Sequence, residues 1–97
     1  MELYGKTMGI VGFGRIGRRV AALAESFGMR VVYNTRTPPS DSTERYRTLE
    51  QLFTEADVVS LHCALTAENS GFVNRSLLER MKTSAFLINT ARGALVN

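Results

Sequence analysis

The stretch GIVGFGRIG, residues 9–17, carries the glycine spacing G-x-G-x-x-G from Gly12 to Gly17. An apolar run over residues 8–12 precedes the motif, and a helical pattern follows it, which is the context that this motif requires. Gly12 then allows a tight turn, Gly14 lets a phosphate approach the backbone, and Gly17 lets the helix pack on the strand. The stretch therefore predicts a strand–turn–helix unit with an anion site.

The anion site is expected at the first turn of the helix. The backbone N–H groups of Arg15 and Ile16 have no intrahelical acceptor there, and the aligned peptides add a partial positive charge. The side chain of Arg15 adds a full charge. The pyrophosphate of a dinucleotide is the anion that we expect, and a purely structural glycine turn is the alternative.

The same alternation continues to the end of the chain. Expected strands cover residues 8–12, 30–34, 57–61 and 85–89, and expected helices cover 15–27, 49–55 (capped by Thr48) and 74–81 (capped by Asn74). The expected apolar stripe of the first helix comprises Ile16, Val20, Leu23, Ala24 and Phe27. Strands and helices in alternation predict an α/β fold, a Rossmann-like doubly wound parallel sheet with helices on both faces. The loops that begin at Gly12, Thr35, His62 and Thr90 should then share one sheet edge, where ligands bind.

Composition excludes several classes of function. The net charge of +3 comes from dispersed arginines, so no nucleic-acid partner is expected. No apolar run reaches the roughly 20 residues of a membrane span. The single cysteine, Cys63, fits a reducing compartment, so we expect a cytoplasmic protein. No metal site is expected.

The choice of dinucleotide depends on the end of the second strand. NAD-binding chains usually place a carboxylate there for the ribose hydroxyls, whereas this chain has Thr35 followed by Arg36. A guanidinium can bind a 2′-phosphate that a carboxylate would repel. We therefore predict NADP(H) in preference to NAD(H). The alternative is that Arg36 is a solvated loop residue and Thr35 merely tolerates NAD.

Two further motifs accompany the glycine motif: HCALT at residues 62–66 and NTARGALV at residues 89–96. With all three in order, the whole chain resembles the nucleotide-binding domain of the D-isomer-specific 2-hydroxyacid dehydrogenases. This family includes glyoxylate/hydroxypyruvate reductases and phosphoglycerate dehydrogenases. The resemblance implies hydride transfer between a nicotinamide and a small 2-oxo or 2-hydroxy acid.

The resemblance also implies roles for residues late in the chain. Arg92 corresponds to the catalytic arginine, which holds the substrate carboxylate and polarises the carbonyl. Thr90 and Ala91 would lie against the nicotinamide ribose, and Cys63 would line the cofactor cleft. His62 resembles a strand-end histidine of the family and not its acid/base.

The family pairs its arginine with a glutamate and a histidine that do not occur in this stretch. We therefore expect residues 1–97 to be part of a dinucleotide-binding domain, without the substrate domain and inactive alone. The strand at residues 85–89 would then form an apolar sheet edge, which favours a homodimer or other self-association.

Two other functions are alternatives to a dehydrogenase. The family resembles corepressors that use this domain as a cofactor-sensing, non-catalytic binding module and keep most of its motifs. The third hypothesis is a methyltransferase or another α/β nucleotide-binding protein. It does not account for the stretch at residues 89–93, and an S-adenosylmethionine site usually has an acidic residue where this chain has Thr35.

Overall fold

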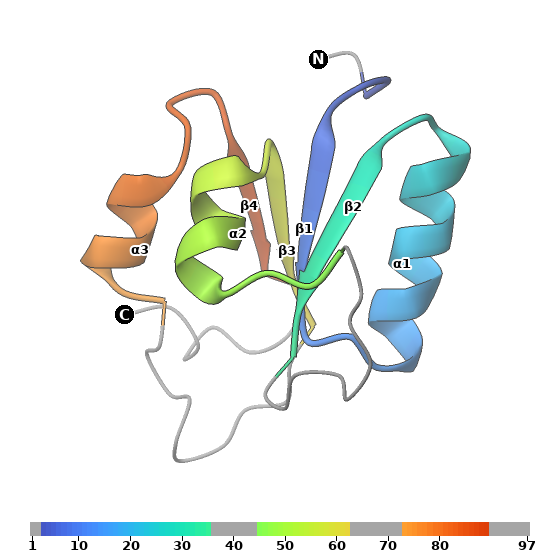
Figure 1. The fold of residues 1–97 in the computed structure, drawn as a ribbon, viewed down its shortest axis with the longest axis horizontal. Helices are drawn as coiled ribbons and strands as arrows, with labels where there is room; N and C mark the ends of the chain where they lie inside the picture. The colour runs from blue at the N-terminus through green and yellow to red at the C-terminus, as the bar shows by residue number, and fades with distance from the viewer. Residues whose placement is uncertain (1–2, 36–44, 63–72, 90–97) are drawn as a thin grey trace.

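The computed structural model describes residues 3–35, 45–62 and 73–89. Within these ranges the chain forms a parallel four-stranded sheet in the order β2-β1-β3-β4 (Figure 1). The elements are β1 (Thr7–Val11), α1 (Arg15–Ser26), β2 (Arg30–Asn34), α2 (Leu49–Glu55), β3 (Val58–Leu61), α3 (Arg75–Arg80) and β4 (Phe86–Asn89).

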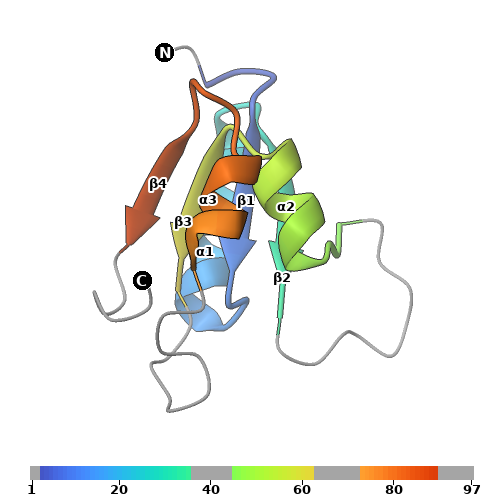
Figure 2. The ribbon, with the colours of Figure 1, turned by 90° about the vertical axis from the view of Figure 1, so that its left-hand side faces the viewer.

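Helices cover both faces of the sheet. Helix α1 lies on one face, and α2 and α3 lie together on the other (Figures 1 and 2). After β2 the chain crosses back over β1, so the strand order reverses between β1 and β3. The predicted α/β doubly wound parallel sheet is confirmed. The reversal places the expected ligand edge at the carboxyl ends of β1 and β3.

Local signals place the element ends close to their predicted bounds. Thr48 caps α2 in a capping box with Gln51, in which each side chain bonds the other residue's backbone N–H. The Asn74 side chain accepts a 3.1 Å hydrogen bond from the Leu77 N–H at the start of α3. Gly28 follows the end of α1 with a φ of 81°, the left-handed conformation that glycine commonly adopts at the end of a helix.

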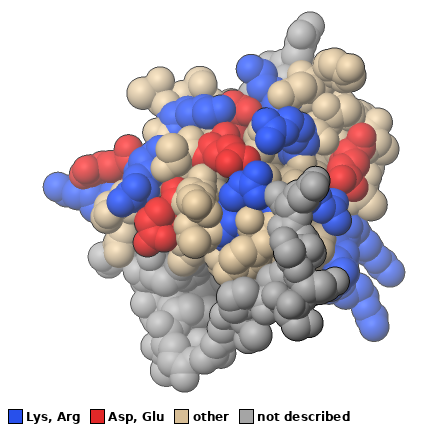
Figure 3. All heavy atoms as spheres, in the orientation of Figure 1, with Lys and Arg blue, Asp and Glu red and all other residues tan. Residues whose placement is uncertain are grey.

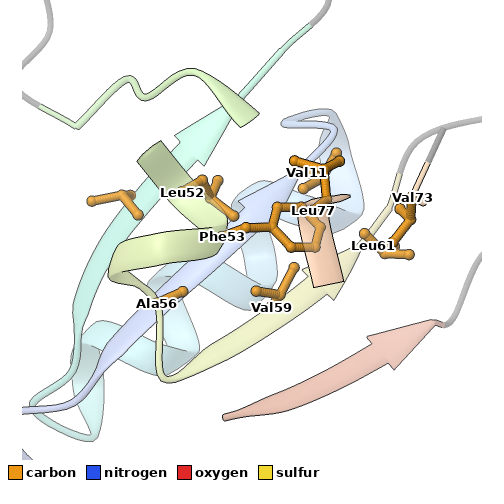
Figure 4. Packing of buried hydrophobic residues seen from close by; sticks show 9 residues of the cluster. Val11, Leu52, Phe53, Ala56, Val59, Leu61, Val73 and Leu77 are labelled. Atoms are coloured by element: carbon orange, nitrogen blue, oxygen red, sulfur yellow. The ribbon is translucent and has the colours of Figure 1, made fainter. Parts of the chain in front are cut away.

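The larger part of the core lies between the sheet and the α2–α3 face. Phe53 of α2 points toward Val11 and Leu77 with Val59 of β3 beneath it, Leu52 lies over β1, and Val73 packs beside Leu61 (Figure 4). All of these side chains are buried. The burial of this cluster holds α2 and α3 against the sheet.

The apolar stripe predicted for α1 is correct only in part: Ala24 is buried and Val20 packs against the core, but the other three members are exposed. Ile16, Leu23 and Phe27 are 66%, 60% and 55% exposed. The helix instead buries its small residues, Gly17 and the alanines at 21 and 24. The helix lies too close to β1 for large side chains to fit between them. The pattern thus predicted an amphipathic helix and the inward positions of Val20 and Ala24, but the buried face is centred on the small residues and not on Ile16, Leu23 and Phe27.

Because large side chains of α1 are directed away from the core, an apolar groove lies between α1 and the strands β3 and β4. It has a volume of about 350 Å³ and includes Leu23 and Phe27 of the helix, Val58 of β3, and Phe86 and Ile88 of β4. Phe86 and Ile88 are 54% and 42% exposed, whereas Leu87 packs against the α2–α3 cluster. One face of β4 is thus packed and the other is open.

A short segment that the sequence did not predict lies beside β2. Tyr46 forms a parallel bridge with Tyr33. The Tyr33 N–H donates to the Arg45 carbonyl and the Arg47 N–H donates to the Tyr33 carbonyl, both at 2.8 Å. Three residues are too few for a recognisable strand pattern. The segment also carries two ion pairs, from Arg45 to Glu25 and from Arg47 to Glu55.

Asp57 ties β1, β3 and the approach to β4 together at the amino edge of the sheet. Its carboxylate accepts the Thr7 N–H at 2.8 Å and an ammonium hydrogen of Lys82 at 3.1 Å. Burial raises the pKa of this carboxyl, but these two hydrogen bonds and the charges of Lys82 and Lys6 outweigh it, and the pKa is lowered. The ionised form therefore stabilises the fold.

Asp57→Ala should lower the free energy of unfolding at neutral pH by about 1–3 kcal/mol, because it leaves the Thr7 N–H without its acceptor. A lowered carboxyl pKa contributes stability above its unfolded value, and this contribution is lost as the pH falls through the folded value. The difference between variant and wild type should therefore shrink in acid. Urea unfolding at several pH values measures this. Glu79→Ala, at an exposed position of α3, is the control, and an equal loss in both variants would contradict the assignment.

Candidate functional site

The carboxyl edge of the sheet brings three predicted loop starts together. The Gly12 N–H donates to the Asn34 carbonyl at 2.9 Å, and the His62 N–H donates to the Val11 carbonyl at 2.7 Å. The ends of β1, β2 and β3 are therefore joined by backbone hydrogen bonds. The expectation that Gly12, Thr35 and His62 share one edge is confirmed. Thr90, the fourth loop start, lies outside the described residues.

Each glycine of the motif has a distinct structural requirement. Gly12 has a φ of 89°, which favours glycine. A Cβ on Gly17 would lie 2.5 Å from the Gly12 carbonyl oxygen, so α1 could not pack as it does. A Cβ on Gly14 would meet no atom within 4 Å. Gly14 is thus not needed for packing, and its missing side chain leaves open space at the start of the helix.

The start of α1 exposes its backbone donors. Gly14 is the N-cap residue and provides no side-chain hydrogen bond. The first intrahelical bond after it runs from the Arg18 N–H to the Gly14 carbonyl at 2.9 Å. The N–H groups of Arg15 and Ile16 precede that bond and have no intrahelical acceptor. No acidic residue lies in the first turn, so a bound anion would meet no repelling charge there.

The end of β2 provides no free carboxylate. The Asn34 side-chain amide donates to the Arg47 carbonyl at 2.8 Å and reaches the Tyr46 hydroxyl at 3.5 Å, so its donors are directed toward the neighbouring segment. Thr35 follows it and is half-buried. A ribose or phosphate placed here would therefore meet a neutral threonine and no carboxylate from Asn34 or Thr35.

An aromatic stack that the sequence did not predict lies at this edge of the sheet. The rings of Phe13 and Tyr33 are stacked with centroids 4.2 Å apart, and Tyr46 meets Tyr33 edge-on at 5.8 Å. The guanidinium of Arg18 lies over Phe13, 4.8 Å from the ring centroid. The sequence does show an aromatic residue, Phe13, inside the glycine motif. A single sequence, however, gives no indication that Phe13 contacts Tyr33.

His62 is a strand-end residue held by its neighbours. Its Nε2 lies 2.7 Å from the Ser60 hydroxyl, which is itself buried. Burial lowers the pKa of His62, so the ring is neutral at physiological pH. This arrangement accords with the structural role predicted for His62.

Several predicted site residues lie outside the described residues: Arg36, Cys63, Thr90, Ala91 and Arg92. Within the described ranges no group of three or more His, Cys, Asp or Glu side chains could hold a metal ion. Among the same residues, none of the helices has the length and apolar character to cross a membrane.

Residues 1–97 match the family described as D-isomer specific 2-hydroxyacid dehydrogenase, NAD binding domain. The chain belongs to this family. It is 45% identical to the glyoxylate reductase of Aeropyrum pernix over 101 residues, which cover 100% of this chain and 30% of that protein.

Solved structures agree with the family assignment. The crystal structure of TT0316 protein from Thermus thermophilus matches with a TM-score of 0.91 and 54% identity, over 100% of this chain and 31% of that one. The D-isomer specific 2-hydroxyacid dehydrogenase from Lactobacillus delbrueckii ssp. bulgaricus, in its NAD complexed form, matches with a TM-score of 0.89 and 34% identity, over 100% of this chain and 30% of that one.

The chain thus spans about 30% of the length of the relatives that it matches, and this part is their NAD-binding domain. A pyridine dinucleotide is therefore the cofactor for this region. The described residues fit such a group, because the open space at Gly14 lies beside the unbonded first-turn N–H groups of α1. The family and the cofactor class predicted from the motifs are confirmed.

The different surroundings of Gly14 and Gly17 give a test of the site. Gly14→Val should leave the melting temperature nearly unchanged, because its φ of −88° suits any residue and the space is open. It should weaken dinucleotide binding by at least about 30-fold, ~2 kcal/mol, by filling the phosphate space. Gly17→Ala should lower the melting temperature, because the added carbon meets backbone. Calorimetry of both variants measures this, and unchanged binding by Gly14→Val would refute the phosphate role.

Proposed function

We propose that the whole protein is an NADP(H)-preferring dehydrogenase that reduces a small 2-oxo acid of the glyoxylate class. The NADP(H) preference is inferred from the residues at the carboxyl end of β2. There the Asn34 amide donates to the Arg47 carbonyl, the next residue is the neutral Thr35, and neither residue is a carboxylate. The substrate class follows from the family and from the glyoxylate reductase relative.

In this proposal the glycine motif binds the pyrophosphate. The N–H groups of Arg15 and Ile16 donate to the phosphate oxygens, with Gly14 giving the space for close approach. Gly12 and Gly17 keep the loop and helix in place. Thr35 and Arg36 then bind the 2′-phosphate of the adenosine ribose, which a guanidinium holds with paired charge-assisted hydrogen bonds.

The residues after β4 form the reaction end of the site in this proposal. Thr90 and Ala91 lie against the nicotinamide ribose, and Cys63 lines the cleft. When bound, the nicotinamide supplies or accepts the hydride. Arg92 holds the carboxylate of the 2-oxo acid and stabilises the negative charge that develops on the carbonyl oxygen. The acid/base histidine and its glutamate belong to the remainder of the protein.

The cofactor preference is tested by calorimetric titration of the protein with NADPH and with NADH. We expect NADPH to bind at least about tenfold more tightly, and Arg36→Gln to remove most of this difference. Arg75→Gln, at an exposed position of α3, is the matched control and should change neither affinity. A wild-type protein that prefers NADH would refute the NADP assignment.

The proposal also includes self-association and a cytoplasmic location. We expect residues 1–97, taken by themselves, to associate through β4, because β4 is a terminal strand of the described sheet and its open face carries Phe86 and Ile88. The single cysteine supports a cytoplasmic location.

Association is measured by light scattering over a range of concentrations. Ile88→Lys should shift the protein toward monomer, because a charge on the apolar edge opposes pairing. Ile16→Lys replaces an exposed apolar residue on α1 and should leave the mass unchanged. A wild-type protein that remains a clean monomer at high concentration would count against the proposal.

A further inference from the structure

The aromatic stack connects the glycine motif to the end of β2. Phe13 lies between Gly12 and Gly14, and its ring lies at an interplanar angle of 15° to that of Tyr33. Tyr33 is only 6% exposed and precedes Thr35 by two residues. Phe13 is therefore fixed against a buried ring, beside the strand end where the adenosine ribose is expected.

Arg18 is held on top of this stack. Its guanidinium carbon is 4.8 Å from the Phe13 centroid, which is the range of a cation–π interaction. The side chain crosses from the fourth position of α1 to the loop, so its charge lies on the β2 side of the helix start. Such a contact restricts a long side chain that would otherwise sample many rotamers.

Arg18 also differs from the other fixed cations of the described residues. Arg45 is paired with Glu25, Arg47 with Glu55, and Lys82 with Asp57. Arg18 has no carboxylate partner within the described ranges. Its charge is thus fixed in place without being neutralised by a carboxylate of residues 3–35, 45–62 or 73–89.

The position of this charge is unfavourable for the helix by itself. The first five residues of α1 include three exposed arginines, at 15, 18 and 19, and no acidic residue lies in the first turn. Figure 3 shows basic side chains gathered on the side of the molecule where α1 begins. A cation near a helix N-terminus is unfavourable, because the aligned peptides place a partial positive charge there. An anion bound at this end would offset that repulsion, and the dinucleotide site is where an anion is expected.

We propose that Arg18 is a specificity-determining residue, a second cation for the 2′-phosphate of NADP(H), positioned by the Phe13–Tyr33 stack. This inference rests on the NADP(H) preference proposed above. In NADP the 2′-phosphate is the group that NAD lacks, and it extends from the ribose at the end of β2. Arg36 follows β2 in the sequence and Arg18 comes from α1, so the phosphate would be bound from two elements.

The inference predicts an effect on one cofactor only. Arg18→Gln should weaken NADPH binding by about tenfold, ~1.4 kcal/mol, and change NADH binding by less than about twofold. Arg18→Lys keeps the charge and should retain part of the preference. Arg19→Gln is the matched control, because it removes the neighbouring exposed charge of the same helix, and it should leave the ratio of the two affinities unchanged.

Titration of each variant with NADPH and NADH separates the possible failures. In one case wild type prefers NADPH, but Arg18→Gln weakens the binding of both cofactors equally or of neither. Arg18 then does not bind the 2′-phosphate and the inference is wrong, while the NADP preference stands. If Arg19→Gln lowers the ratio as much as Arg18→Gln, the effect is general charge and the inference is also wrong. If wild type does not prefer NADPH, the proposed preference itself fails, and the inference fails with it.

Discussion

The close approach of Gly17 to the Gly12 carbonyl is the contact on which the arrangement of the site depends. A Cβ at Gly17 would lie 2.5 Å from that oxygen and 3.2 Å from the Ile10 side chain. Only glycine lets α1 lie this close to β1. The same approach directs the first turn of α1 at the loop after β1, so that a packing contact in the core sets the position of the phosphate-binding N–H groups.

The short distance between α1 and β1 also decides which side chains α1 can bury. Ala21 and Ala24 follow Gly17 along the sheet side of the helix, and larger residues are directed away. Leu23 and Phe27 consequently border the apolar groove beside β4 instead of filling the core. On the other face of the sheet α2 buries larger side chains, Leu52 and Phe53, and Leu52 lies so close to Gly9 of β1 that a Cβ there would be 2.6 Å from its Cδ2.

Charges are distributed unevenly between the two edges of the sheet. At the amino edge, Asp57 is ionised and accepts bonds from Thr7 and Lys82. At the carboxyl edge, the loop-start residues Gly12, Thr35 and His62 are uncharged at neutral pH, and the guanidinium of Arg18 lies over Phe13. An anionic ligand there meets no carboxylate among these loop-start residues. This asymmetry is what makes the reversal of strand order, which occurs in many folds, a site for a phosphorylated cofactor.

Local patterns in the sequence determined the elements of the fold and the phosphate motif. The caps Thr48 and Asn74, the left-handed Gly28 and the spacing of Gly12, Gly14 and Gly17 act within one or two turns of chain, so they can be read without neighbours. Only the tertiary structure decided the buried side of α1, the pairing of Tyr46 with Tyr33, and the Arg18–Phe13–Tyr33 stack. These depend on distances between segments separated along the chain, and a linear pattern does not contain such distances.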